Sequence, residues 1–344
     1  MKHSKQLESC VFYFFNEHEV KNKKQKIHKI VQIDFFIQNE LTNQTKLLKT
    51  KNIKQHFYLC ENTSQLQITH INDEDTNINH KYSKHDDTIL LEFQDRNLIY
   101  FKNYLKALSS STKYLLTIIS SYKHLLNSIH LLVSNNIFHN HIHFDSIVVD
   151  KSEHILLSNF SFSIDYSHAD IQQYIRHFII AYDPSYLEWP IEIHLLSYLL
   201  TNKLNSLSSY NIETIITEYI NHNHILNTFG STVVSSYKDQ SLKYFKKYVN
   251  QTYDYILADM LQYACTWDNY ALSILYLRIL IGIHRTIGIK NKFIILFMKL
   301  LVNNIHLNPF SRDSIDITIN KFDILLDSLE PKDYKEVINN LMSA

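Results

Sequence analysis

Three histidines alternate along one short segment of the chain, at positions 139, 141 and 143. In an extended segment, alternate side chains point to the same face. Neutral imidazole is a common ligand of Zn²⁺, and it can also accept a proton near neutral pH. His139, His141 and His143 therefore indicate either a metal site or a proton-transfer site. Neither an H-E-x-x-H motif nor a cysteine pair accompanies them, which weighs against a zinc metalloenzyme.

The residues after these histidines have the order of two strands and a turn. An apolar run at 147–149 is followed by the polar turn 150–153, the apolar run 155–157 and then Asn159-Phe160-Ser161. This order resembles the catalytic loop of protein kinases, H-R-D-x-K-x-x-N, followed by a hairpin and D-F-G.

The resemblance places a different residue at every position that does chemistry in the family. His139 matches the motif's His, His141 its catalytic Asp, His143 its Lys and Ser146 its Asn, while Asn159 matches the D-F-G Asp. In kinases the catalytic Asp orients the substrate hydroxyl, and the D-F-G Asp and the Asn hold Mg²⁺ against the ATP phosphates. Mg²⁺ is a hard ion that binds through carboxylates and phosphates, so a neutral amide in place of the D-F-G Asp removes its principal anchor. The resemblance thus implies that no residue at this site is a functional catalytic residue and that no metal is bound.

Later motifs match structural positions of the family, and these are retained. The segment 189–192, Trp-Pro-Ile-Glu, resembles A-P-E with Glu192 on its Glu, and Trp267-Asp268 resembles the start of the buried helix F with Asp268 on its Asp. The resemblance implies that Asp268 accepts hydrogen bonds from the catalytic-loop backbone and that Glu192 pairs with the late Arg312. The form W-P-[IL]-E-x-H before W-D-x-Y is similar to the kinase-like proteins of large nucleocytoplasmic DNA viruses.

Glycine is scarce, and this excludes a second part of kinase chemistry. The chain has 3 glycines in 344 residues, where usage of about 7% is ordinary. They lie at positions 230, 282 and 288, all in the C-terminal half. A Gly-rich loop, which lets the backbone approach the ATP phosphates, therefore cannot exist near the N-terminus.

The N-terminal residues predict a small sheet and a helix. Apolar runs at 10–15, 27–33 and 88–93 favour strands, 73–87 is polar and predicts a loop, and 34–49 favours a helix with Asp34 as its N-cap. On the resemblance this helix is helix C, with Glu40 as the glutamate that pairs the strand-three lysine. Lys29 or Lys26 is the candidate for that lysine, and Glu92 lies at the hinge.

The remainder predicts helices. Residues 97–108 and 112–134 favour helices, the second with apolar residues at three- and four-residue intervals. The distance from Glu192 to Asp268 is long for the family, so 195–262 is predicted to be a helical insert whose apolar content makes it pack. We therefore expect an α+β, bilobal protein-kinase-like fold with an N-lobe at 1–96 and a C-lobe at 97–344.

Composition places the protein among soluble intracellular ones. Thirty-four basic and 34 acidic residues cancel, so no net field recruits nucleic acid or an anionic membrane. Three cysteines, at positions 10, 60 and 265, fit a reducing compartment, and the N-terminus lacks an apolar signal region. The longest apolar stretch, 270–289, contains Arg278, His284 and Arg285, which favours a core helix over a membrane span. We expect a cytoplasmic location, which for a viral protein means the host cytoplasm or the virion.

Together these features predict a catalytically inactive pseudokinase that acts as a protein-binding or allosteric module. The alternative is a divergent but active serine/threonine kinase that transfers the γ-phosphate of ATP to protein. Binding of ATP without a metal stays open, because the hinge backbone and an apolar cleft suffice to hold adenine. The insert is the expected partner-binding surface, since it departs most from the family's frame.

Overall fold

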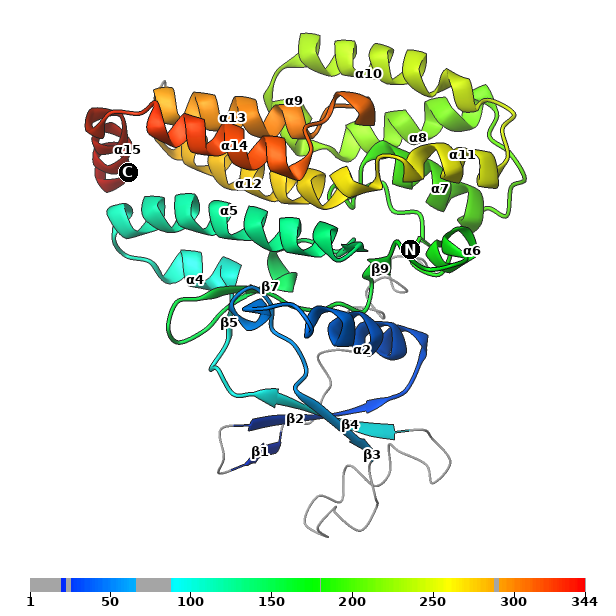
Figure 1. Cartoon of the computed structure of the whole chain (residues 1–344). Coiled ribbons are helices and arrows are strands. Elements are labelled where there is room, and N and C mark those ends of the chain that lie inside the picture. Colours follow the sequence, from blue (N-terminus) through cyan, green and yellow to red (C-terminus); the bar gives the residue numbers. More distant parts are fainter. Residues whose placement is uncertain (1–19, 23–25, 66–87, 180, 288–290, 344) are drawn as a thin grey trace.

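The computed structural model describes residues 20–22, 26–65, 88–179, 181–287 and 291–343. The fold is α+β: a small antiparallel sheet and one helix form the N-terminal part, and the rest is mostly helical (Figure 1). This confirms the predicted division into a β-rich N-terminal part and a larger helical part. The predicted strand at 10–15 and the predicted loop at 73–87 lie outside the described residues.

Four antiparallel strands form the N-terminal sheet, in the order β1-β2-β4-β3. They are β1 (Val20–Asn22), β2 (Lys26–Gln32), β3 (Asn62–Gln65) and β4 (Thr88–Gln94). Strand β2 pairs with β4 over its whole length, with Lys29 opposite Leu91. The apolar runs 27–33 and 88–93 are thus strands, as predicted, and their inward side chains form a separate small core that includes Ile27, Val31 and Leu91.

Helix α2 (Phe35–Leu47) follows β2 directly, as the sequence predicts. The side chain of Asp34 accepts a hydrogen bond from the Ile37 N–H at 2.8 Å, which satisfies one of the free amides of the first turn. The buried face of this helix is unusual because it is largely polar, with Asn39, Glu40, Asn43 and Gln44 all buried. The short helix η1 (Ile53–Gln55) then leads back to the sheet.

The middle of the chain carries one long helix and three short strand pairings. The elements are β5 (Ile99–Tyr100), α4 (Phe101–Ala107), α5 (Ser111–Ser134), β6 (Ile137–Phe138), η3 (Phe144–Ser146), β7 (Ile147–Val149), β8 (Ile155–Leu157), β9 (Ile164–Asp165) and α6 (Ile171–Ile175). The helix predicted at 97–108 is shorter than expected. Its first residues form β5 instead, because Ile99 and Tyr100 pair with Val149 and Val148 of β7.

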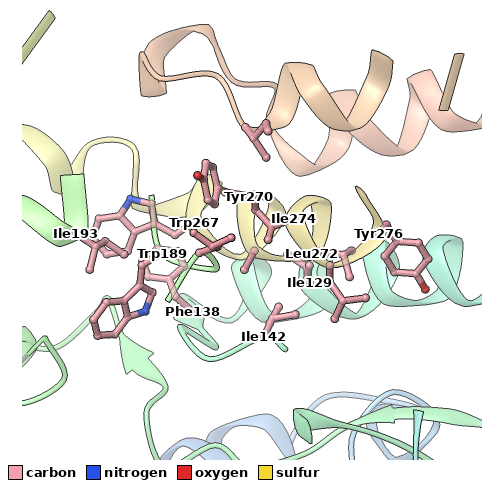
Figure 2. Close-up of a cluster of buried hydrophobic side chains, with 14 of the residues drawn as sticks. Ile129, Phe138, Ile142, Trp189, Ile193, Trp267, Tyr270, Leu272, Ile274 and Tyr276 are labelled. Carbon is pink, nitrogen blue, oxygen red and sulfur yellow. The ribbon is translucent and has the colours of Figure 1, made fainter. Parts of the chain in front are cut away.

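The C-terminal half is helical. Its elements are α7 (Ile191–Thr201), α8 (Ser209–His222), α9 (His224–Thr228), α10 (Ser231–Phe245), η4 (Lys246–Tyr248), α11 (Tyr253–Leu261), η5 (Ala264–Thr266), α12 (Trp267–Ile287), α13 (Lys292–Asn304), η6 (Pro309–Ser311), α14 (Ile315–Asp327) and α15 (Pro331–Ser343). Helix α12 lies in the middle of this part and contacts α5, α9, α13 and α15. Figure 2 shows its side chains beside Ile129 of α5 and beside Phe138 and Ile142. The apolar stretch at 270–287 is therefore a core helix within the described residues.

The insert at 195–262 is helical and belongs to the main core. Its apolar side chains, among them Leu207, Ile215 and Tyr219, are buried in the same cluster as α5 and α12. Helix α8 packs on α7, and α10 packs on α8 and α9. No helix among the described residues has the length and apolar character needed to span a membrane.

Candidate functional site

The segment 137–165 runs between the two parts of the molecule and is fixed by two pairings. Strand β6 pairs with β9, so residues 139–163 form a long loop whose two ends are held together. Strands β7 and β8 form a hairpin within this loop. The hairpin joins the N-terminal part because the Tyr58 N–H donates to the Leu157 carbonyl at 2.8 Å. The sequence predicts this hairpin correctly.

Asp268 holds the loop that carries the three histidines. Its two carboxylate oxygens accept hydrogen bonds from the backbone N–H groups of His139 and Asn140, at 2.7 and 2.9 Å. The indole of Trp189 donates to the Asn140 carbonyl at 3.1 Å, so the loop is held from two sides. Burial raises the pKa of Asp268 to about 6, and the two N–H donors oppose this shift. Asp268 lies at the start of α12, far from the loop in sequence.

His139 is buried and supports the loop. Its Nε2 lies 2.9 Å from the carbonyl oxygen of Ser158, so the proton is on Nε2, and its ring packs edge-on against Phe160 with centroids 4.9 Å apart. Burial lowers its pKa to about 4. The neutral imidazole of His139 therefore links the histidine loop to Ser158, directly after strand β8.

His141, His143 and Tyr186 form a chain of hydrogen bonds. The Asp145 N–H donates to Nδ1 of His143 at 2.9 Å, which puts the proton of a neutral His143 on Nε2. That nitrogen lies 2.8 Å from Nε2 of His141, which must accept; Nδ1 of His141 then carries its proton and donates to the Tyr186 hydroxyl at 2.9 Å. Both nitrogens of His141 are thus occupied by side chains of the protein itself.

Electrostatics keep this chain neutral. Burial, together with the nearby imidazoles of His143 and His139, holds the pKa of His141 well below its usual range. Burial also lowers the pKa of His143, although Glu188 opposes the shift. Glu188 is itself paired with Arg278. A proton taken up by His141 would therefore meet no counterion among the residues that the structure describes, and it would break one of the two hydrogen bonds of His141.

The two positions that match the family's metal ligands make local hydrogen bonds. The Ser146 hydroxyl accepts from the His143 N–H and donates to the His143 carbonyl, both at 3.0 Å, and so caps η3. The Asn159 side chain accepts from the Ser161 hydroxyl at 2.8 Å. Asn159 has a left-handed backbone, with φ 63°, a conformation that Asn tolerates better than most residues. Across the described ranges no three His, Cys, Asp or Glu side chains are grouped as a metal site.

The three histidines do not share one face, as an extended segment would require. His141 and His143 bond to each other, but His139 turns to the Ser158 carbonyl and the Phe160 ring. The three imidazoles therefore do not converge on one point, as tetrahedral coordination requires. The expectation of a common face failed because the segment is not a flat strand: Asn140 has φ 58°, which turns the backbone between His139 and His141.

Helix α2 packs against the site through a row of buried side-chain amides. Asn39 donates to the carbonyls of Ser161 and Ser163 at 2.9 and 2.8 Å, and Asn43 donates to Ser163 at 3.0 Å. Glu40 accepts from the Gln44 side chain at 2.8 Å and from the Phe160 N–H at 3.4 Å. The amide row binds α2 to the residues just after Asn159-Phe160.

The lysine candidates occupy different places. Lys26 forms an ion pair with Glu92, which also accepts from the Asn62 side chain at 2.7 Å. Lys29 lies on the same strand, with its Nζ 5.3 Å from the centre of the Phe93 ring. Glu92 thus lies within β4 and ties together three strands of the sheet.

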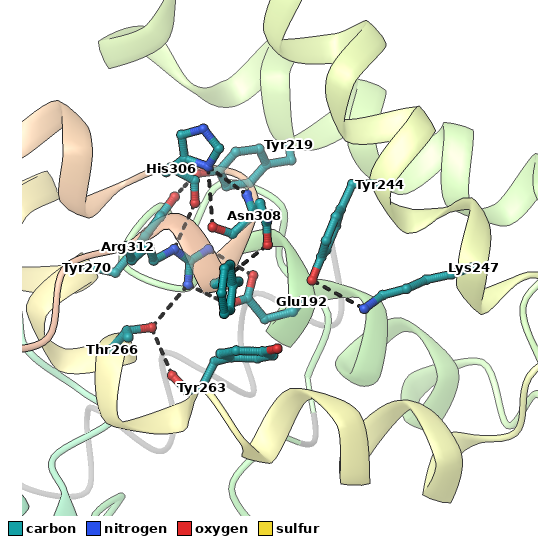
Figure 3. A network of polar contacts seen from close by, with 11 residues as sticks. Glu192, Tyr219, Tyr244, Lys247, Tyr263, Thr266, Tyr270, His306, Asn308 and Arg312 are labelled. Atoms are coloured by element: carbon teal, nitrogen blue, oxygen red, sulfur yellow. Dashed lines mark hydrogen bonds and ion pairs between the residues drawn. The ribbon is translucent and has the colours of Figure 1, made fainter.

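Glu192 and Arg312 meet in the helical part. Arg312 donates through both terminal nitrogens to the carboxylate of Glu192, and its Nε donates to the His306 carbonyl at 2.8 Å (Figure 3). The guanidinium also lies over the Tyr270 ring, 4.8 Å from its centre. The Tyr270 hydroxyl bonds that of Tyr219 from the insert, so insert residues cover the pair.

Sequence reasoning missed Tyr186, Asn39 and Asn43. The two asparagines are four residues apart on a predicted helix, so their shared face was detectable. Tyr186 gave no signal, because only the tertiary fold brings it to His141.

In the comparisons with known proteins, no family model matches this chain and no curated protein gives a significant match.

Proposed function

We propose that the protein is a pseudokinase: a bilobal protein-kinase-like fold that does not transfer phosphate and acts by binding another protein. The observation that carries the proposal is the state of His141. At the position of the catalytic Asp it presents an uncharged ring whose two nitrogens already bond His143 and Tyr186. A general base must be within hydrogen-bond reach of the proton that it takes and free to accept it.

The kinase-like fold is supported by two contacts that the resemblance implies. Asp268 accepts hydrogen bonds from the loop backbone at 139 and 140, and Glu192 pairs with Arg312. These residues come from four distant segments, and an accidental motif match would not require them to meet. The sheet followed by α2, with the larger helical part after it, fits the same proposal.

Loss of phosphoryl transfer is supported by the missing charges. Phosphoryl transfer depends on positioned cations and carboxylates that act together. Here Ser146 and Asn159 make only local bonds, and the sequence has no Gly-rich loop. The test is phosphorylation of the protein itself and of generic substrates with ATP and Mg²⁺ or Mn²⁺. We expect none above background; robust transfer that is lost in His141→Ala would favour an active serine/threonine kinase instead.

Nucleotide binding is a separate question with its own measurement. We propose that any ATP binding is independent of metal, because no carboxylate lies at the Ser146 and Asn159 positions. The melting temperature with ATP should be the same with and without Mg²⁺. A shift that requires Mg²⁺ would contradict the proposed loss of the metal site.

A protein partner is proposed to bind the insert. The most exposed large apolar side chains of this region are Tyr210 at 75%, Tyr255 at 55% and Val233 at 46%. Changing each of them to Ser should weaken co-purification of the partner. The matched control changes Leu116 and Ile324, exposed apolar residues of α5 and α14, to Ser. Equal loss in both variants would place the surface elsewhere.

A further inference from the structure

Two histidines lie face to face where the N-terminal part meets the helical part. His56 ends η1, and His124 lies in α5. Their rings are stacked, with centroids 4.6 Å apart and planes within 2° of parallel. Neither residue belongs to the site around His141.

The hydrogen bonds of this pair define its protonation. The Ser128 hydroxyl donates to the His124 carbonyl at 2.9 Å, so towards Nδ1 of His56, 3.0 Å away, it acts as the acceptor. A neutral His56 therefore has its proton on Nδ1. Its backbone is also fixed, since the His56 carbonyl accepts from the Leu157 N–H at 2.9 Å. The stack and this bond hold the residues after η1 to α5 and to strand β8.

No acidic side chain of the described residues contacts either ring, although the backbones of Ile155 and Gln55 oppose the fall in the pKa of His124. Within the described ranges no carboxylate lies at ion-pair distance from His56 or His124. The charged and titratable groups on the elements around the rings are engaged elsewhere: Lys54 with Glu61, Lys123 with Asp323, Lys113 with Glu153, and His154 and Arg96 with Asp150. His154 adds a like charge near His124 when it is protonated.

We propose that the stacked pair of His56 and His124 is an acid-sensitive clasp between the N-terminal and helical parts. The clasp is closed while the rings are neutral. When both rings are protonated they separate, and the residues after η1 leave α5. The clasp does not depend on the proposed pseudokinase function.

Repulsion and burial give the clasp its direction. Two unit charges 4.6 Å apart repel strongly in a partly buried site. Burial, with the neighbouring His124, lowers the pKa of His56 to about 4, and burial likewise lowers the pKa of His124. Free imidazoles have a pKa of about 6.5. The open form therefore binds more protons below about pH 6.5, so acid favours opening.

The size of the effect follows from these values. With a pKa of about 4 when closed and about 6.5 when open, His56 alone makes opening about 30-fold more favourable at about pH 5 than at about pH 7.5. His124 increases this factor further.

Hydrogen exchange at the Tyr58 and Leu157 amides measures the opening directly. After correction for the intrinsic exchange rate, we expect their protection to fall at least about 30-fold from about pH 7.5 to about pH 5. In a variant with His56→Phe and His124→Phe, the stack cannot be protonated and protection should change much less. His222→Gln, at the exposed end of α8, is the control and should behave as the wild type. Equal losses in the wild type and the Phe variant, or no loss in the wild type, would overturn the clasp.

If the Phe variant does not fold, the wild type alone decides the matter. NMR titration of the two imidazoles should give pKa values below those of free histidine. Values at or above about 6.5 for both rings would refute the proposal.

Discussion

Arg312 and Glu192 form a two-bond ion pair with side-chain exposures of 1% and 0%. Removal of one partner leaves the other charge buried without compensation, which costs about 3–5 kcal/mol. We expect Glu192→Gln and Arg312→Leu each to lower the free energy of unfolding by about that amount in urea denaturation. The matched control is Lys113→Gln, which breaks the exposed pair with Glu153 and should leave the free energy of unfolding nearly unchanged, because solvent screens that pair. Equal effects of the buried and exposed changes would mean that the buried pair is not closed in solution.

Introducing the residues of the kinase motif should not produce phosphoryl transfer. The five changes are His141→Asp, His143→Lys, Ser146→Asn, Asn159→Asp and Ser161→Gly. Catalytic groups that act as a unit do not add one by one, so His141→Asp alone should give no activity and all five together at most a trace. The reason is that the Gly-rich loop is still missing. Incorporation of labelled phosphate measures this, and efficient transfer by the single variant would contradict it.

His194 should limit stability. It is fully buried, and among the described residues neither ring nitrogen makes a hydrogen bond of good geometry, although the backbones of Trp189 and Tyr186 lie near enough to oppose the fall in its pKa. Such a group costs about 1–3 kcal/mol, so His194→Leu should leave stability unchanged or raise it at neutral pH. Urea denaturation measures this. A large loss of stability would show that the imidazole has a partner.

The same substitution should have a larger benefit in acid. Burial lowers the pKa of His194 to about 4, below the value of about 6.5 in an unfolded chain. The unfolded chain therefore takes up a proton at His194 before the folded protein does. This loss of stability is absent above about pH 6.5 and grows as pH falls towards about 4. The advantage of His194→Leu should grow over this interval, and a constant difference between the two proteins would contradict the shifted pKa.

Deletion of the insert should unfold the protein. Its buried residues share one core with α5 and α12, and Tyr219 covers the Glu192–Arg312 pair from α8. Each large apolar side chain contributes about 1.5–3 kcal/mol through burial, so the remaining chain would not compensate for their loss. Circular dichroism should show loss of the folded state, while Tyr210→Ser on the exposed face of α8 should melt as the wild type. A truncated protein with a sharp melting transition would show that the insert is a separate unit.

The sequence predicts local features well and distant contacts poorly. Residues 34–49 and 112–134 are recognisable because apolar spacing and a capping residue, Asp34 in the first case, act within a few positions. Strand β5 was missed because Ile99 gains its conformation from Val149, fifty residues away. At the site, His141 could be identified from its motif, but its contact with Tyr186 depends on the packing of a segment whose sequence has no mark of that role.

The left-handed backbone at Asn159 would accept either an asparagine or an aspartate without damage to the fold. A position with positive φ admits few residues, and Asn and Asp are both enriched there. The two side chains have the same size and differ in charge, so the exchange of one for the other is conformationally silent. The backbone conformation at position 159 is therefore accessible to either Asn or Asp. If the proposed loss of phosphoryl transfer holds, an exchange of Asp for Asn at this position would need no compensating change in the neighbouring residues.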